Sequence, residues 1–594
     1  MKYTLATVTG IILFILVVGM ICVISLVGMA ASDTATVNVK DNSVFVLSLN
    51  GAVQERSSEG MDFLTMLSGN KMDTMGLDDI LESISKAKEN ENIKGIYIES
   101  GAVEFDSYAT VQTIRDALAD FKKSGKWIVA YGDQYLQMSY WLASVADEVY
   151  LNKTGMLDLR GLGRKAEFDT GLLDKLGVKY QAVRVGKYKS YVESNTQTGM
   201  SDYDREQRTA YLTGIWNYWV KEMAEGRKVK PEQLDQLAND SIIMFADTKD
   251  YIKAKLVDKV MFPDEIKAEI KNRLKLDKED EIHQLTLSDM INVKTKKKGK
   301  GDQIAVYYAY GSIVDNEALD MMSGLGHNIV GKTTSADLIK LAEDDDVKAV
   351  VFRVNSGGGS AVASEQIRHA IKLLKAKKPV VVSMGGIAAS GGYWISSPAN
   401  YIFAEPTTIT GSIGIFGLVP NFSGLVQDKL GITFDGVTTH RYTDFENDLV
   451  LAKDNTEIMK FMQTYVDRGY QSFLDIVSEG RGMKPAEVDS IGQGRVWLAT
   501  DALKIRLVDK LGSLEDAVKK AAELAKLDEY HTTAYPGKGS WMDQILSTEK
   551  KGTYLDGELR ELLGDLYEPL MQIRYDMKAN NRIQARMLDD VRVK

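Results

Sequence analysis

The chain is poor in the residues that form disulfides and bind metals. Its 594 residues include one cysteine, Cys22, so no intrachain disulfide can form. It has five histidines and contains neither a His-Glu-x-x-His motif nor a cysteine cluster. We therefore predict no metal site and no bound cofactor.

Positive charge is not in excess either. Lysine and arginine total 73 against 83 aspartate and glutamate, which gives a net charge of -10. Nucleic-acid-binding domains normally show clustered excess basic residues, so we predict no nucleic-acid partner. The one basic run, residues 294–300, is typical of a solvated linker.

Charge is missing altogether between Tyr3 and Ser32, and residues 5–31 are almost continuously apolar. A helix of that length spans about 40 Å, more than the hydrocarbon core of a bilayer at about 30 Å. The apolar stretch is also longer than that of a secretory signal peptide, about 7 to 15 residues. We expect residues 1–32 to be an uncleaved membrane anchor, and Lys2 before it favours a cytoplasmic N-terminus with the rest outside.

What the chain does contain is an internal repeat. Residues 174–177 (Asp-Lys-Leu-Gly) recur at 428–431, and Glu-Gly-Arg at 225–227 recurs at 479–481, both displaced by 254 positions. Matches in one register indicate a tandem repeat. We expect two copies, residues 44–290 and 304–536, joined by a basic linker at 291–303 and followed by a charged helical tail at 537–594.

Each copy predicts an α/β fold with parallel strands. Short apolar runs alternate with amphipathic helical stretches, which is typical of parallel strands joined by helices. In each copy a long helix is expected to end at the glycine of Glu-Gly-Arg. The runs lie at 44–49, 95–98, 127–130, 304–310, 349–354 and 380–383, and the long helices at 203–226 and 456–480.

The copies differ at the positions where chemistry would occur. Ser390 in the second copy lies among alanines and glycines, whereas the first copy has Gln137 and Met138 there. A lysine at Lys189 in the first copy faces Thr443 in the second. One copy therefore carries a candidate nucleophile and the other a candidate base.

Two glycine-rich turns of the second copy, 355–360 and 385–392, follow successive strands. Glycines let backbone N–H groups approach a ligand, so an attack by Ser390 Oγ on a carbonyl would have Gly391 and Gly358 as natural oxyanion donors. The alternatives are a tight strand-to-helix connection or a phosphate or coenzyme cradle. The second turn fits neither the dinucleotide fingerprint nor the Walker pattern.

The residues alone leave the base open among Lys189, Lys187 and His440. His440 is the one histidine in a plausible loop. A lysine must be neutral to act as a base, and its pKa of about 10.4 in water has to fall by roughly two to three units through burial.

These motifs resemble one family. The chain is similar, over nearly its whole length, to the long form of signal peptide peptidase A (protease IV, peptidase family S49), which has a Clp-protease and crotonase-like fold. One departure is Gly357, which stands where the family usually has proline. The motifs lie at 188–190 (Tyr-Lys-Ser), 355–359 (Asn-Ser-Gly-Gly-Gly), 389–394 (Ala-Ser-Gly-Gly-Tyr-Trp) and 410–414 (Thr-Gly-Ser-Ile-Gly).

The resemblance implies that Ser390 is the nucleophile of a serine endopeptidase, that Lys189 is its base, and that Ser412 orients the lysine. It also implies cleaved signal peptides as substrates and contact with inner-membrane lipid. The protein would be a homo-oligomer, a tetramer by resemblance, with its catalytic part on the periplasmic side of a bacterial inner membrane. A crotonase-like acyl-CoA enzyme and a non-catalytic peptide-binding scaffold are the alternative hypotheses.

Overall fold

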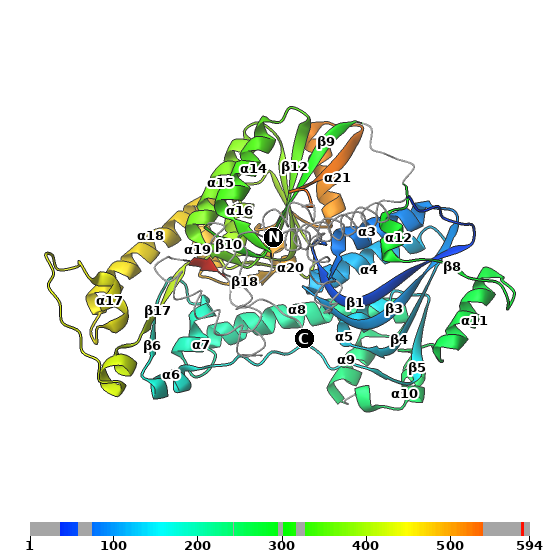
Figure 1. Cartoon of the computed structure of the whole chain (residues 1–594), viewed down its shortest axis with the longest axis horizontal. Helices are drawn as coiled ribbons and strands as arrows, with labels where there is room; N and C mark the ends of the chain where they lie inside the picture. The colour runs from blue at the N-terminus through cyan, green and yellow to red at the C-terminus, as the bar shows by residue number, and fades with distance from the viewer. Residues whose placement is uncertain are drawn as a thin grey trace, which may run out of the picture.

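A computed structural model describes residues 36–57, 74–240, 243–294, 301–315, 327–538 and 584–586 (Figure 1). The predicted anchor, most of the basic run and most of the C-terminal tail lie outside these ranges. No helix within the described ranges is long and apolar enough to cross a membrane.

The N-terminal half (residues 36–294) is built on a parallel sheet in the order β2-β1-β3-β4-β5-β7, with β8 also beside β1. Helices cover the sheet and bury a core that includes Phe45, Ile98 and Trp141. The strands are β1 (Ser43–Gln54), β2 (Thr74–Gly76), β3 (Ile93–Phe105), β4 (Trp127–Tyr135), β5 (Glu148–Leu157), β7 (Lys259–Val260) and β8 (His283–Leu285). The helices include α3 (Leu77–Glu89), α4 (Tyr108–Lys122), α5 (Gln137–Ala143), α8 (Asp202–Arg227), α9 (Pro231–Asp240), α10 (Thr248–Lys253), α11 (Pro263–Leu274) and α12 (Leu287–Ile291).

The C-terminal half (residues 301–538) has a second large sheet in the order β18-β16-β14-β12-β9-β20, with β15 between β14 and β19. Its pairs are parallel except β16 with β18. The strands are β9 (Asp302–Tyr310), β12 (Val347–Ser356), β14 (Val380–Ala389), β15 (Tyr401–Ala404), β16 (Ile409–Gly411), β18 (Val496–Leu498), β19 (Lys510–Leu511) and β20 (Tyr530–Tyr535). The helices include α14 (Gly331–Glu343), α15 (Ala361–Lys375), α16 (Gly391–Ser396), α17 (Phe445–Leu451), α18 (Thr456–Arg481), α19 (Pro485–Ile491), α20 (Ala499–Lys504) and α21 (Leu514–Ala525).

The parallel α/β architecture predicted from the apolar runs is confirmed. Each of the six expected strands falls within a strand of a large sheet, namely β1, β3, β4, β9, β12 and β14. The run 380–382 is three valines with no exposed surface. Continuous apolar sequence of this kind forms a strand that is buried on both faces, as helices on both sides require.

The expected role of the glycines in the two Glu-Gly-Arg motifs is wrong. α8 and α18 continue through Gly226 and Gly480 and stop one residue later, where Lys228 and Gly482 adopt positive φ angles of 53° and 60°. A Cβ on Gly226 would lie 2.1 Å from Ser144 O, and one on Gly480 2.2 Å from Ser397 O. Each glycine therefore permits close helix packing, and does not end its helix.

A third sheet joins the two halves, in the order β11-β10-β13-β21-β17-β6. β6 (Lys179–Arg184) belongs to the N-terminal half of the chain, but it pairs antiparallel with β17 (Phe416–Asn421) of the C-terminal half. This pair lies at one side of the molecule in Figure 1, away from β3, β4 and β5. The other strands are β10 (Ser312–Val314), β11 (Asn328–Val330), β13 (Gly358–Ser360) and β21 (Gln584–Arg586).

β21 belongs to the tail that we expected to be helical. These three residues pair antiparallel with β13 and with Phe416 of β17, so at this point the tail is a strand. Leu555 and its helically spaced neighbours, on which the expectation rested, lie outside the described residues.

Candidate active site

Ser390 lies at the sharp junction between β14 and α16. Its backbone has φ 56° and ψ -116°, a conformation rare for a residue with a side chain. The amide of Ser390 donates to Gly411 O at 2.8 Å, and the carbonyl accepts from Trp394 N at 2.8 Å, which hold the turn. Such strain persists only where the surroundings enforce it, and it is common in functional residues.

Lys189 reaches this serine from the other half of the chain. It lies just after β6, between Tyr188 and the short helix η1 (Ser190–Val192). Its Nζ is 2.8 Å from Ser390 Oγ, although the two residues are 201 positions apart. The lysine is 2% exposed and the serine 0%. Burial lowers the pKa of the Lys189 amine well below its usual value of 10.5, because a charged amine is poorly solvated there.

Ser412 completes the surroundings of the amine. It follows β16 with a φ of 50°, and its Oγ lies 3.0 Å and its carbonyl oxygen 3.3 Å from Lys189 Nζ. The hydroxyl in turn donates to Gly494 O at 3.3 Å. A neutral amine has two N–H donors and one lone pair. The two N–H groups can donate to the two oxygens of Ser412, and the lone pair is then free to accept a hydrogen bond from the hydroxyl of Ser390.

A loop that the sequence analysis missed holds the lysine in place. Tyr188 N donates to Gln493 O at 2.9 Å, and a Cβ on Gly494 (φ 76°) would lie 2.7 Å from Lys189 Cβ. The sequence contained a signal. The register of 254 places Ala-Asn-Asp at 238–240 opposite residues 492–494, and the register of 251 that aligns Leu-Val-Asp-Lys at 256–259 with 507–510 places Ser-Ile-Ile at 241–243 there, so in neither register does the first copy have these glycines. The first copy lacks the glycines of this loop, just as it lacks the glycines around Ser390.

The lysine loop is also tied to the start of α8, which the sequence analysis did not single out. Ser190 Oγ donates to Asp204 Oδ1 at 2.6 Å, and Gln207 Nε2 donates to Tyr188 O at 3.0 Å. Asp204 is buried and pairs with Arg208 Nε at 2.7 Å. The backbone on both sides of Lys189 is therefore fixed by α8.

The two predicted oxyanion donors come from different loops that pack together. Gly391 opens α16 directly after the serine, and Gly358 opens β13 with a φ of 103°. Gly358 N donates to Ser356 Oγ at 3.1 Å. A Cβ on Gly392 would lie 2.4 Å from Ser356 O, so the glycine lets the two loops meet. Gly357, which stands where the family usually has proline, lies in the chain between Ser356 and Gly358.

The other two candidate bases lie elsewhere. Lys187 is exposed, with its Nζ 5.4 Å from the ring centroid of Tyr188 and 4.9 Å from that of Tyr203. His440 is exposed, and its Nδ1 lies 3.0 Å from Thr439 Oγ1. Of the three, Lys189 is the one that the fold brings to Ser390.

An extended segment of chain runs past the site. β21 pairs with β13 in the register Gly358 with Arg586 and Ser360 with Gln584, and it pairs with β17 on its other side. A strand can therefore lie between β13 and β17 and beside Gly358. A small pocket lined in part by Tyr188, Lys189 and Ser412 adjoins the amine.

Comparison with known proteins gives one consistent result. The model of peptidase family S49 matches residues 120–277 and 372–528, one segment in each half, and a Clp protease model matches residues 300–407. Protease 4 of Salmonella typhi is 34% identical over 510 residues, covering 85% of this chain and 80% of its own. Protease 4 of Haemophilus influenzae is 34% identical, covering 84% and 82%. The chloroplastic serine protease SPPA of Arabidopsis thaliana is 28% identical, covering 82% and 70%.

Proposed function

The chain belongs to peptidase family S49 and is a serine protease, and from this premise we propose that Ser390 and Lys189 are its catalytic dyad. The observation that carries the proposal is the 2.8 Å approach of the buried amine to the hydroxyl. The dyad closes within a single chain, with one member from each half.

In the proposed reaction the lone pair of neutral Lys189 takes the proton of Ser390 Oγ as the oxygen attacks the peptide carbonyl. Ser412 orients the amine by accepting its two N–H groups. The charged amine then gives its proton to the departing peptide nitrogen, and an acyl-enzyme remains. Water attacks this ester, Lys189 takes the water's proton, and the proton returns to Ser390 as the second product leaves.

The oxyanion of each tetrahedral intermediate would be bound by the N–H groups of Gly391 and Gly358. Gly391 N–H lies at the start of α16, directly after the serine. Gly358 N–H donates to Ser356 Oγ at 3.1 Å in the structure and would exchange this acceptor for the oxyanion. Loss of one such donor typically lowers the rate about 10²- to 10³-fold.

We further propose that the substrates are cleaved signal peptides and other apolar peptides bound in extended form. The pairing of β21 with β13 and β17 supports this, since it shows that an extended chain fits beside Gly358. Backbone pairing of this kind accepts many sequences, as degradation of varied peptides requires. The anchor at residues 1–32, contact with inner-membrane lipid, a periplasmic catalytic part and a homo-oligomeric state also belong to this proposal.

Co-reconstitution tests both the substrate and the anchor. We expect the full chain in lipid vesicles to cleave an apolar signal peptide at least about tenfold faster when both share a vesicle than when they occupy separate vesicles, because tethering raises the effective concentration. The assay follows product by mass spectrometry at equal total concentrations. Equal rates in the two mixtures, or cleavage of a soluble polar peptide in preference, would refute this part of the proposal.

A further inference from the structure

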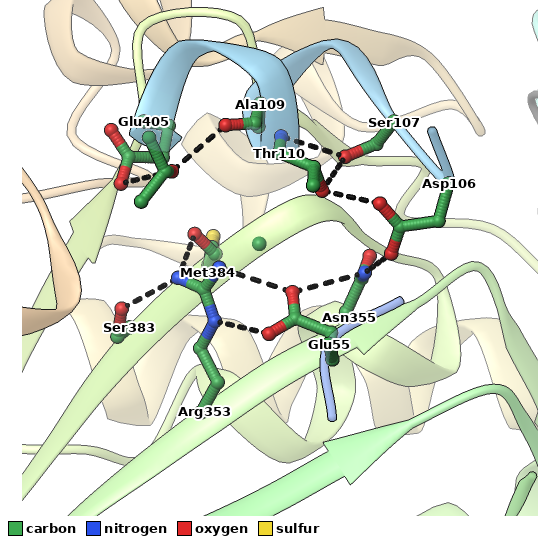
Figure 2. A network of polar contacts seen from close by, with 12 residues as sticks. Glu55, Asp106, Ser107, Ala109, Thr110, Arg353, Asn355, Ser383, Met384 and Glu405 are labelled. Carbon is green, nitrogen blue, oxygen red and sulfur yellow. Dashed lines mark hydrogen bonds and ion pairs between the residues drawn. The ribbon is translucent and has the colours of Figure 1, made fainter. Parts of the chain in front are cut away.

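A buried polar cluster joins residues of the N-terminal and C-terminal halves of the chain (Figure 2). Glu55 directly follows β1 and Asp106 directly follows β3, so both come from strand ends of the N-terminal half. Arg353 and Asn355 lie near the end of β12 in the C-terminal half. The proposed chemistry uses none of these four side chains, yet β12 leads to Gly358 and the neighbouring strand β14 leads to Ser390.

Arg353 and Glu55 form a two-pronged ion pair. Arg353 Nε lies 3.1 Å from Glu55 Oε2, and Nη2 lies 3.0 Å from Oε1, with each side chain 2% exposed. The remaining nitrogen of Arg353, Nη1, donates to Ser383 Oγ at 3.0 Å and to Met384 O at 3.2 Å, both on β14. A buried guanidinium needs a carboxylate partner, so the place of Arg353 against β14 depends on Glu55.

Asn355 links the same carboxylate to the backbone of β14. Its Nδ2 donates to Glu55 Oε1 at 3.1 Å and to Asp106 Oδ2 at 3.1 Å. Its Oδ1 accepts from Ile387 N at 3.1 Å. Asn355 and Ile387 each lie three residues before a proposed catalytic group, Gly358 and Ser390 respectively.

Two glycines of β14 make room for the N-terminal half. A Cβ on Gly385 would lie 2.5 Å from Glu55 Oε1, and a Cβ on Gly386 would lie 2.1 Å from Ser107 Cβ. We expected these glycines to belong to a turn that approaches a ligand. They lie within the strand, and they allow close packing against Glu55 and Ser107.

We propose that Glu55 is a positioning residue for the reaction, and that it aligns Ser390 with the oxyanion donor Gly358. Through Arg353 and Asn355 its carboxylate joins the end of β12 to the end of β14. The N-terminal half would thus supply both the base and the group that sets the nucleophile and the oxyanion donor relative to each other. This inference rests on the proposed dyad.

Glu55 is a better test position than Asp106. Burial, and then the charge of Glu55, raise the pKa of Asp106 and so favour its neutral form. Glu405 is also fully buried nearby, and burial raises its pKa to about 8. Glu55 is the carboxylate that contacts Arg353 with both oxygens.

The test replaces the charge without changing the size, by Glu55→Gln. We expect kcat per active serine to fall about 10- to 100-fold, because an ångström of misplacement at a reacting group has an effect of this size. KM for a peptide should change by less than about threefold. The affinity of a peptide aldehyde, whose adduct needs the oxyanion donors, should fall in parallel with kcat. The final extent of fluorophosphonate labelling gives the concentration of active serines. Dividing the rate by this concentration corrects kcat for any unfolded protein in the sample.

Asp509→Asn is the matched control. It removes the charge of a carboxylate that pairs with Arg481 in the C-terminal half, where Asp509 Oδ1 lies 2.6 Å from Arg481 Nη2, and it should leave kcat per active serine unchanged. If Glu55→Gln does not fold, Asn355→Ser tests the same link, and the same fall in kcat and aldehyde affinity is expected. Unchanged kcat per labelled serine in the folded variant, or an equal fall in Asp509→Asn, would overturn the inference.

The dyad variants keep the two proposals separate. If Ser390→Ala and Lys189→Met are inactive while Glu55→Gln matches the wild type, the positioning role alone is wrong. If the dyad variants remain active, the proposed function itself fails, whatever Glu55→Gln does.

Discussion

Replacing Lys189 with methionine is expected to lower kcat/KM by about 10⁴- to 10⁶-fold, the range seen when a member of a hydrolytic dyad or triad is removed. Methionine fills nearly the same volume as the lysine stem, so the loss cannot be attributed to a cavity. Peptide hydrolysis is measured by product formation at fixed pH. The reason is chemical, since the amine is the one group whose lone pair lies within hydrogen-bond distance of Ser390 Oγ in the described part of the chain.

Lys187→Met and His440→Ala are the matched controls, because both side chains are exposed. Each should keep most of the wild-type activity. A Lys189→Met variant with more than about one-tenth of wild-type activity, or a dead His440→Ala variant, would reverse the assignment of the base.

Lys189→Met also has a consequence for stability with a definite sign. Burial lowers the pKa of the amine in the folded protein below its usual 10.5. At pH values between the folded and the unfolded pKa, the unfolded chain binds one more proton than the folded chain, and the stability of the wild type therefore rises with pH. The variant lacks this dependence. Its melting temperature should exceed that of the wild type near pH 7, and the difference should shrink as the pH approaches 10.5.

Ser390→Ala is expected to reduce turnover by a similar factor, about 10⁴- to 10⁶-fold, because no acyl-enzyme can form without the hydroxyl. Peptide affinity should persist, since backbone pairing with β13 and the N–H groups of Gly358 and Gly391 are unchanged. Hydrolysis is compared with peptide binding, followed by fluorescence of a labelled apolar peptide.

Ser396→Ala serves as the control for this prediction. Ser396 is a buried serine at the end of α16, the short helix that begins directly after Ser390, and its hydroxyl donates to Gly392 O at 2.6 Å. It should retain activity. Residual cleavage by Ser390→Ala equal to that of Ser396→Ala would exclude Ser390 as the nucleophile.

Much of the scaffold follows from local sequence. Runs such as 380–382, three consecutive valines, predict strands buried on both faces, and the fold has β14 there. The contrast between the copies, Ser390 against Gln137 and Lys189 against Thr443, pointed to residues that the fold brings within 2.8 Å of each other. Choosing Lys189 over Lys187 required the family resemblance, because burial and not sequence distinguishes the two lysines.

The rest depends on contacts between distant segments. The pairing of β6 with β17, which delivers the lysine, joins residues more than 230 positions apart, and neither strand shows its partner in its own pattern. The ion pair of Glu55 with Arg353 could not be predicted from local sequence either, because the two residues are 298 positions apart and meet where the two halves of the chain pack. The prediction of a helical tail rested on the spacing of leucines around Leu555. Residues 584–586 form a strand because their backbone pairs with β13 and β17.

The central claim is that an uncharged amine from one half activates a hydroxyl from the other. The most direct test is the rate at which a fluorophosphonate modifies Ser390, measured against pH in the wild type and in Lys189→Met. We predict that the wild-type rate rises between about pH 6 and 9 as the amine loses its proton, and that the variant loses this rise. A flat wild-type profile, or the same rise in Lys189→Met, would contradict the mechanism.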